Sequence, residues 1–290
     1  MNAAAIFAFL CLSLIIPHSA EAIDPLGLQE RIPRVVPQGG AFIVTLKPAV
    51  TIEVLRGSLG DQQLIFSADG RGRLQALVGI DLEAAGQRVL RLEAPDRQGR
   101  VRVREWTIRV RPRRFAVQRL TLPQHMVDLD PDASARVSRE TDRLKELWRD
   151  VTPERFWRGP FASPVRAPRA PEGFGHRRII NDQPRAPHSG ADYKAPPGTL
   201  VVAANAGRVA LAEEQFFAGN AVVLDHGLGL YTIYFHLQTF LVEAGDMVRK
   251  GQEIGRVGAT GRATGPHLHF GVRLQGARID PAALLRLSFP

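Results

Sequence analysis

The feature that most limits the possible folds of this sequence is its punctuation by glycine, proline and aspartate. Between residues 23 and 122, these residues separate short β-prone runs at roughly ten-residue spacing. Short strands at this spacing are typical of two packed antiparallel sheets, so we expect residues 23–122 to form an immunoglobulin-like β-sandwich. The runs are Ala41–Leu46, Thr51–Leu55, Gln63–Phe66, Leu74–Ile80, Val89–Leu92 and Arg100–Arg113.

The last of these runs changes phase along its length. Val101 and Val103 alternate in one phase, whereas Trp106 and Ile108 alternate in the other. A slip of one residue predicts a β-bulge near Arg104–Glu105. The alternating arginines of the run form either a basic docking face or a solvated strand face, and the solvated face is the simpler interpretation. These arginines are Arg102, Arg109 and Arg111.

Residues 123–170 are expected to form a connector. Asp130-Pro131 is a favourable N-cap and first-turn pair. Apolar residues then recur at multiples of three and four, which predicts an amphipathic helix from Asp132 to Asp150. The aromatic and proline-rich stretch from Phe156 to Pro171 predicts an extended segment between two domains.

Residues 171–290 alternate short hydrophobic runs with glycine, and they contain no convincing helical period. This pattern predicts a compact antiparallel β domain with many glycine turns. The predicted fold class of the chain is therefore mainly β, with a sandwich-like N-terminal domain, a helical connector and a C-terminal β domain.

The first 22 residues have the pattern of a secretory signal peptide. The apolar run Ala3–Ile16 is shorter than the ~20 residues that span a bilayer. Pro17 and the small-residue pattern Ala20-Glu21-Ala22 follow, so we expect cleavage after Ala22, export to the periplasm or cell envelope, and no stable membrane insertion of the cleaved chain. No Lys or Arg precedes the run, and a retained anchor is the alternative. Cleavage would remove Cys11, the only cysteine.

Charge and cysteine content limit the partners and the chemistry. The formal net charge is +9, which favours an anionic neighbour such as nucleic acid, a membrane surface or a cell-wall polymer. No basic run is interleaved with aromatic residues, so we do not expect nucleic-acid binding. A single cysteine excludes an intrachain disulfide, a four-cysteine zinc site and an iron–sulfur cluster.

Six of the eight histidines lie between residues 176 and 269. In a strand, His267 and His269 would project from one face, with Leu268 and Phe270 on the other. His188 and Asp192 are four residues apart, and we expect a turn to fold them together at the start of a strand. Two imidazoles and a carboxylate suit a catalytic Zn²⁺ that keeps a fourth position for water. Periodicity does not determine which of His267 and His269 would bind the metal, and an exposed histidine pair is more often simply solvated.

The motifs of this half resemble, in order, those of the M23 family of zinc metallopeptidases, the lysostaphin/LytM-like endopeptidases. The resemblance covers about residues 171–285, and residues 23–150 more loosely resemble the front half of exported bacterial members. The motifs are Phe174-Gly-His-Arg177, His188-x-Gly-x-Asp192, Gly219-Asn220, His226-Gly, Tyr231-Thr-x-Tyr-x-His236-Leu, Gly245-Asp-x-Val248, Gly251-Gln-x-Ile-Gly255, Gly258-x-Thr-Gly261, Thr264-Gly-Pro-His-Leu-His-Phe270 and Asp280-Pro281.

The resemblance implies a role for five residues. His188, Asp192 and His269 would bind one Zn²⁺ per chain, and His236 and His267 would be an uncoordinated catalytic pair. The implied activity is a zinc-dependent endopeptidase that hydrolyses peptide cross-links of bacterial peptidoglycan through a metal-activated water. Peptidoglycan peptides would be the substrate.

Two other interpretations remain open at this point. A non-catalytic envelope module could bind peptidoglycan or activate another wall hydrolase, although such relatives typically lose residues that this chain keeps. A biotin- or lipoyl-type carrier would need a lysine at a hairpin tip, and Lys194 and Lys250 are poorly placed for it. We expect His176 and His226 to be surface or loop-stabilising residues, with support of the metal ligands as an alternative role for His226, and Arg177 to line the groove or make a structural ion pair. From its position alone, the segment Phe156–Pro171, together with the N-terminal domain, is a candidate cover for the groove.

Overall fold

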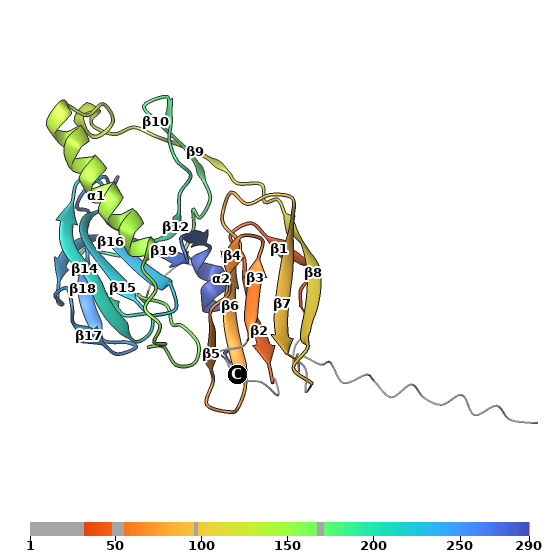
Figure 1. The fold of residues 1–290 in the computed structure, drawn as a ribbon. Coiled ribbons are helices and arrows are strands. Elements are labelled where there is room, and N and C mark those ends of the chain that lie inside the picture. The colour runs from red at the N-terminus through yellow and green to blue at the C-terminus, as the bar shows by residue number, and fades with distance from the viewer. Residues whose placement is uncertain (1–31, 48–54, 96–97, 167–170, 290) are drawn as a thin grey trace, which may run out of the picture.

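The computed structural model describes residues 32–47, 55–95, 98–166 and 171–289. The predicted signal peptide, Cys11 and most of the expected strand Thr51–Leu55 lie outside these described residues. No helix in the described ranges is both long enough and apolar enough to cross a membrane. The described chain is mainly β, as predicted (Figure 1).

The N-terminal region contains two β-sheets packed around one core. Val44, Val78, Leu90, Leu92 and Ile108 are fully buried between the sheets, which confirms the predicted pairing of sheets. One sheet has the order β1 (Val35–Pro37), β8 (Val101–Arg111), β7 (Gln87–Pro95), β3 (Arg56–Leu59) and β4 (Gln62–Gln63), and the other has the order β2 (Ala41–Leu46), β6 (Leu74–Gly79) and β5 (Phe66–Ala68).

The β-bulge predicted near Arg104–Glu105 is wrong. Strands β7 and β8 pair in unbroken antiparallel register from Gln87–Arg109 to Pro95–Val101. Val101 is 64% exposed and Val103 41% exposed, so both lie on the solvent face together with Arg109. The alternation of hydrophobic residues along β8 changes phase because these two valines are on the exposed face. The backbone pairing itself continues without interruption.

Strand β9 (Val117–Leu120) lies before the predicted connector, and the connector itself begins with a short 3-10 helix, η2 (Gln124–Met126). The predicted amphipathic helix is α1 (Pro131–Arg149), and the Asp130 carboxylate accepts the backbone N–H of Ala133 at its first turn. This N-cap and Pro131 fix where the helix begins. The apolar face of α1 packs on the C-terminal sheet through Leu144, Leu147 and Trp148.

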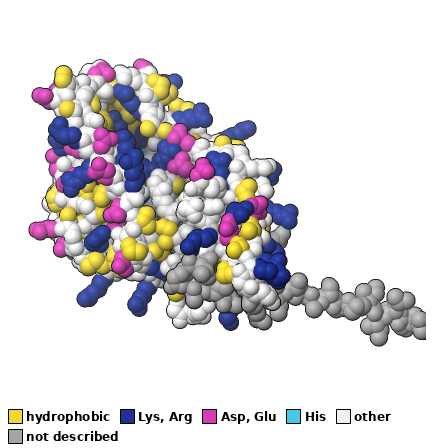
Figure 2. Space-filling model, in the orientation of Figure 1, with side chains coloured by type: hydrophobic (Ala, Val, Ile, Leu, Met, Phe, Trp, Pro, Cys, Tyr) yellow, Lys and Arg dark blue, Asp and Glu magenta, His cyan; other side chains and the backbone are white. Residues whose placement is uncertain are grey.

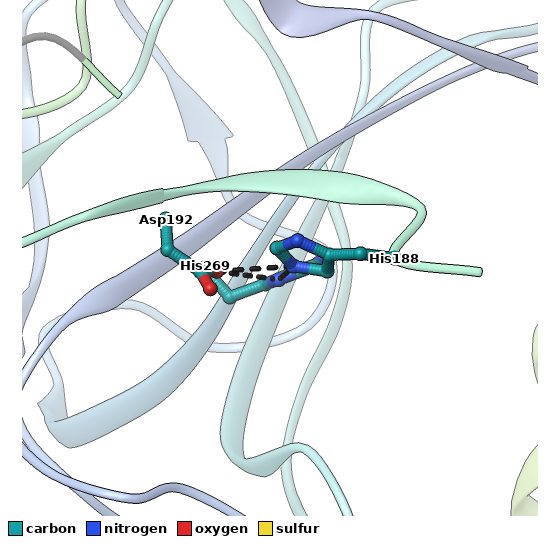
Figure 3. A group of neighbouring side chains, drawn as sticks. All are labelled: His188, Asp192 and His269. Atoms are coloured by element: carbon teal, nitrogen blue, oxygen red, sulfur yellow. Dashed lines mark hydrogen bonds and ion pairs between the residues drawn. The ribbon is translucent and has the colours of Figure 1, made fainter. Parts of the chain in front are cut away.

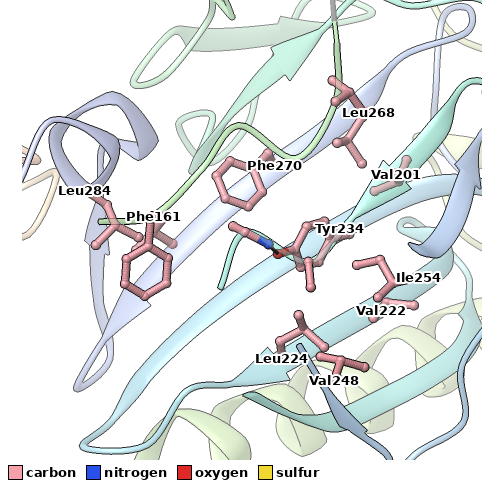
Figure 4. Close-up of a cluster of buried hydrophobic side chains, with 14 of the residues drawn as sticks. Phe161, Val201, Val222, Leu224, Tyr234, Val248, Ile254, Leu268, Phe270 and Leu284 are labelled. Carbon is pink, nitrogen blue, oxygen red and sulfur yellow. Dashed lines mark hydrogen bonds between the residues drawn. The ribbon is translucent and has the colours of Figure 1, made fainter. Parts of the chain in front are cut away.

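The segment that follows α1 is irregular, as expected, but it is not a linker between domains. Trp157, Phe161 and Val165 are 3–5% exposed and belong to the hydrophobic core of the C-terminal region (Figure 4). Backbone hydrogen bonds also tie the segment down, for example from Ala162 N–H to the carbonyl of Ala204. The proline content determines the extended conformation, and the aromatic side chains determine that it is buried.

The C-terminal region is built on one nine-stranded sheet, and its strand pairs are antiparallel, as predicted. Its main order is β12 (Gly190–Tyr193), β19 (Leu268–Leu274), β16 (Leu230–Phe240), β15 (Gly219–Asp225), β14 (Gly207–Gln215) and β17 (Met247–Val248). Strand β18 (Glu253–Val257) pairs with β16 and β13 (Leu200–Val202), and β20 (Ala277–Ile279) pairs with β19. A separate three-stranded sheet joins β9 to β10 (Arg177–Ile180) and β11 (Gln183–Pro184).

The core of this region holds one face of β19 in place. Leu268 and Phe270 are fully buried beside Tyr234 and Val222 (Figure 4). Burying such a side chain is worth about 1.5–3 kcal/mol, so the core defines which way the strand faces. His269 lies between these two residues and projects from the opposite face, as the alternation of a strand requires.

The short helix α2 (Pro281–Leu285) was not predicted from the sequence. Its five residues are too few to establish a helical period, but Asp280 accepts the N–H of Ala282 and Pro281 occupies the first turn. The pair Asp280-Pro281 is the same start signal that predicted α1, so this helix could have been found from its cap alone.

Candidate metal centre

Two paired strands and the segment before them bring three potential metal ligands together (Figure 3). Asp192 in β12 lies directly opposite His269 in β19 in the antiparallel register. His188 lies two residues before β12 begins. The expected turn between His188 and Asp192 is wrong, because the chain is irregular up to Ser189 and then extended.

The ligand atoms of these three residues converge on one point. His188 Nε2 and His269 Nδ1 each lie 3.1 Å from Asp192 Oδ1, and the two nitrogens are 2.8 Å apart. All three atoms lie within 4.8 Å of one another. Two imidazole nitrogens and one carboxylate oxygen form a donor set that suits zinc, since calcium and magnesium prefer oxygen ligands.

The outer nitrogen of His188 determines the orientation of its ring. His188 Nδ1 lies 2.9 Å from the carbonyl oxygen of Gly173 and donates a hydrogen bond to it. The proton therefore lies on Nδ1, and the lone pair of Nε2 points toward Asp192. Fixing the tautomer through the second nitrogen is a common feature of metal-binding histidines.

The absence of a side chain at Gly190 leaves space for the imidazole ring of His269. A Cβ at position 190 would lie 2.6 Å from His269 Nε2 and 2.6 Å from the carbonyl oxygen of Phe270. Both contacts are shorter than van der Waals distance, and one involves the backbone of the paired strand. Only glycine at this position allows β12 to approach β19 closely with the imidazole between them.

Burial and hydrogen bonding set the charges of this group. Burial favours protonation of Asp192, but the neighbouring imidazoles of His188 and His269 outweigh it and hold the pKa of the carboxyl well below its usual range. Burial lowers the pKa of His269 to about 4, although its hydrogen bond to Asp192 opposes this shift. At neutral pH the group is thus an ionised carboxylate beside a neutral imidazole, which is the form that binds a metal ion.

His236 and His267 lie next to these ligands. Their ring centroids are 4.8 Å apart, and the centroid of His236 is 6.1 Å from that of His269. His236 Nδ1 donates to the carbonyl of Thr260 over 2.9 Å, and His267 Nδ1 to that of Gly265 over 2.8 Å. The structure therefore brings all five predicted site residues together, and within the described residues neither of these two rings has a hydrogen bond at Nε2.

His236 also has an unusual backbone. Its φ of 62° lies in the left-handed region, which is costly for a residue with a side chain. A backbone hydrogen bond to Ala218 and the side-chain bond to Thr260 hold it there. Burial, with His267 and His269 nearby, lowers the pKa of His236 to about 3, so its imidazole is neutral at pH 7. Strain held in this way is typical of functional sites.

The two other histidines of this region are placed differently from one another. His226 is fully buried and bonded to the carbonyl of Ala206 and to Thr232 Oγ1, so it is a structural residue, which agrees with the loop-stabilising alternative and not with a surface position. His176 is half-buried and lines a pocket together with Asp192 and His267.

The arginine nearest the site is Arg178 and not Arg177, which the sequence had indicated. Arg177 is exposed, whereas Arg178 places Nη2 3.7 Å from Asp192 Oδ2. Successive residues of β10 point to opposite faces, so the phase of the strand decides which of the two faces the site. Arg262, which lines the same cleft as Arg178, carried no sequence signal.

A cleft of about 250 Å³ adjoins the five residues, and His188, His236 and His269 form part of its lining. The opposite wall is helix α1, through Val137, Glu140, Thr141 and Leu144. A second pocket beside Asp192 and His267 is lined by Gln118 and Leu120 of β9. Strand β9 and helix α1 thus border the site, while the described part of Phe156–Pro171, the candidate cover for the groove, packs into the core instead.

Comparison with known proteins gives matches concentrated in this region. Residues 186–281 match the model of Peptidase family M23. The peptidoglycan DD-endopeptidase ShyC of Vibrio cholerae is 41% identical over 121 residues, which is 41% of this chain and 28% of that protein. The DD-carboxypeptidase/endopeptidase Mpg of Neisseria meningitidis is 43% identical over 97 residues, which is 33% of this chain and 22% of that protein. The aligned part of this chain thus spans about a quarter of each relative.

A solved structure extends the similarity beyond this region. A crystal structure of a Pseudomonas aeruginosa protein described as a peptidase M23 superposes with a TM-score of 0.64 at 28% identity. The superposition covers 89% of this chain and 96% of the other. The similarity in fold therefore includes residues outside 186–281.

Proposed function

Because residues 186–281 form a peptidase family M23 domain, we propose that this protein is a zinc-dependent endopeptidase that hydrolyses peptide cross-links of bacterial peptidoglycan. One observation carries the proposal. A half-buried carboxylate and two buried imidazoles meet at one point, and two further histidines, whose Nδ1 atoms are held by backbone carbonyls, lie beside them. This combination supplies both a metal site and groups that can move a proton.

His188, Asp192 and His269 would hold the ion. The fit is supported by the donor set, by the fixed tautomer of His188 and by the neutral state of His269. When bound, zinc supplies Lewis-acid chemistry, since it polarises a carbonyl and lowers the pKa of water toward 7.

His236 and His267 would act on the proton and on the developing charge. Each ring donates from Nδ1 to a backbone carbonyl, and this leaves Nε2 as the acceptor in the neutral form. One Nε2 can therefore accept a proton from the attacking water, and a protonated ring of the pair can donate to the oxyanion at the scissile carbonyl. The fixed orientation of the two rings favours proton transfer and oxyanion stabilisation, because the rings need not reorient during the reaction.

The substrate class is supported by the names of the relatives and by the charge of the chain. ShyC is called a peptidoglycan DD-endopeptidase, and the net charge of +9 suits an anionic wall polymer. Export to the periplasm or cell envelope, as the sequence of residues 1–22 predicts, would place the protein beside that polymer.

The test is digestion of purified peptidoglycan with and without a chelator, followed by mass spectrometry of the released fragments. We expect peptide-bond cleavage that the chelator abolishes and added Zn²⁺ restores, and no cleavage by a His236→Ala variant. Binding to the wall without any cleavage would instead support a non-catalytic envelope module.

A further inference from the structure

Two arginines line the space where a substrate would lie. Arg178 and Arg262 both border the cleft that contains His236 and His269. Both also border the pocket that Gln118 and Leu120 line beside Asp192 and His267. They come from distant parts of the chain, since Arg178 is in β10 and Arg262 is in the loop before β19.

The surface around this cleft is basic. In Figure 2, dark-blue basic side chains gather where the surface is hollowed between α1 and β10.

The two guanidinium groups have little charge compensation within the described residues. Arg262 forms no ion pair there, and its guanidinium carbon lies 3.8 Å from the centroid of the Phe217 ring. Arg178 approaches only Asp192, over 3.7 Å, and the other oxygen of that carboxylate lies 3.1 Å from each of two imidazole nitrogens. The buried Nε of Arg178 has no hydrogen-bond partner.

These charges are also partly removed from water. Burial lowers the pKa of Arg262 to about 10, and the nearby charges of Arg178 and Arg185 add to the effect. A partly buried cation without a partner is costly, and two such cations in one cleft repel each other. A bound anion removes both costs, and the planar guanidinium fork matches a carboxylate with two parallel hydrogen bonds.

The position of Arg262 is tied to that of the proposed catalytic histidine. The N–H of Arg262 bonds to the carbonyl of Phe217, and the carbonyl of Thr260, two residues earlier, holds the ring of His236. A group that Arg262 binds is therefore kept at a fixed distance from His236. The cleft encloses about 250 Å³, less than a typical small-ligand pocket of ~300–1,000 Å³, so it suits one side chain or chain end and not a whole cross-link.

We propose that Arg262, assisted by Arg178, binds a free carboxylate of the peptide substrate, so that the enzyme selects peptides with a negative charge beside the scissile bond. The inference rests on the proposed function and adds a substrate requirement to it. Arg262 would be the main determinant, because Arg178 also contacts the carboxylate of a proposed metal ligand.

The experiment uses one cross-linked muropeptide in two forms, with its carboxylates free or converted to amides. We expect the unmodified protein to cleave the free-carboxylate form with a kcat/KM about tenfold higher, as the loss of one charge-assisted contact predicts. Arg262→Gln should lose about tenfold on the free form, mainly through KM, and little on the amidated form, while retaining its bound zinc. Arg177→Gln, which changes the exposed neighbouring arginine, should behave like the unmodified protein.

Two results would overturn the inference while leaving the proposed function intact. One is equal cleavage of both forms by the unmodified protein, and the other is an equal loss on both forms in Arg262→Gln, which would mean that stacking on Phe217 is a structural role. If neither form is cleaved, the proposed function fails. Titration calorimetry with the two forms then decides separately whether Arg262 confers tighter binding of the free carboxylates.

Discussion

Arg278 in β20 holds the carboxylate of Asp81, which lies 197 residues earlier in the chain. Its Nη2 and Nε donate to the two carboxylate oxygens over 2.6 and 3.0 Å, and its backbone N–H adds a third bond. Burial opposes ionisation of Asp81, but Arg278 outweighs it and the pKa of Asp81 falls below its ordinary value. This contact joins the N-terminal sandwich to the sheet that carries the proposed metal ligands Asp192 and His269.

Asp81→Ala should therefore lower the free energy of unfolding by about 1–3 kcal/mol, since it leaves a partly buried guanidinium without its partner. Glu83→Gln is the matched control. Glu83 also pairs with Arg278, but it is largely exposed, so the change should stay within about 0.5 kcal/mol. Denaturant unfolding of both variants measures the difference. Equal midpoints for the two variants would contradict the importance of the Asp81 contact.

Alanine substitutions of His269, in β19, and of His267, just before that strand, should show which histidine binds the metal and which acts in turnover. His269→Ala removes a proposed ligand, so we expect loss of bound zinc and of activity together. His267→Ala removes a ring whose Nε2 lies 3.7 Å from Asp192 Oδ1, and we expect it to keep zinc and lose turnover by at least about a hundredfold. Elemental analysis and a cleavage assay on the same samples provide the comparison. A zinc-free His267→Ala protein would disprove the proposed division of roles.

Gly190→Ala should weaken the metal centre without touching a ligand. The added methyl group would meet His269 Nε2 and the carbonyl of Phe270 at 2.6 Å, so strands β12 and β19 must separate. We expect zinc affinity to fall at least about tenfold, as for other changes around metal ligands. Gly265→Ala is the control, because a Cβ there would meet nothing within 4 Å. Identical zinc affinity in the two variants would exclude the proposed steric role.

Acidification should destabilise the fold through His226. Burial lowers the pKa of His226 to about 4, whereas the unfolded chain binds a proton near pH 6.5. Below pH 6.5 the unfolded state therefore takes up a proton that the folded state refuses, and stability falls by about 3 kcal/mol between pH 6.5 and pH 4. His226→Gln should flatten this part of the pH dependence of unfolding, whereas His125→Gln, at an exposed position, should not. Parallel curves for all three proteins would contradict the assignment.

Local pattern predicted the parts of the fold that depend on local physics. The alternation in His267–Phe270 correctly placed Leu268 and Phe270 in the core, because a strand has only two faces. The pair Asp130-Pro131 correctly placed the start of α1, because a cap satisfies N–H groups within the same turn. Both signals lie within a few residues of the feature that they predict.

The errors occurred where distant contacts decide the outcome. Val101 and Val103 are hydrophobic residues on an outer face, and their sequence does not reveal that nothing covers them. The stretch around Trp157 and Phe161 has the composition of a linker, yet a sheet formed later in the chain buries it. Arg178 and Arg262 became neighbours of the site only through the register of β10 and the course of a loop.

Helix α1, which forms one wall of the cleft, lies outside the residues that match the family. The proposed reactive centre and this one wall of the cleft therefore belong to separate stretches of sequence. Two enzymes with the same reactive centre can differ in the breadth of what they admit simply because a different upstream helix rests beside it. Grafting this helix onto a related catalytic domain is accordingly a route to altering substrate choice while leaving the chemistry unchanged.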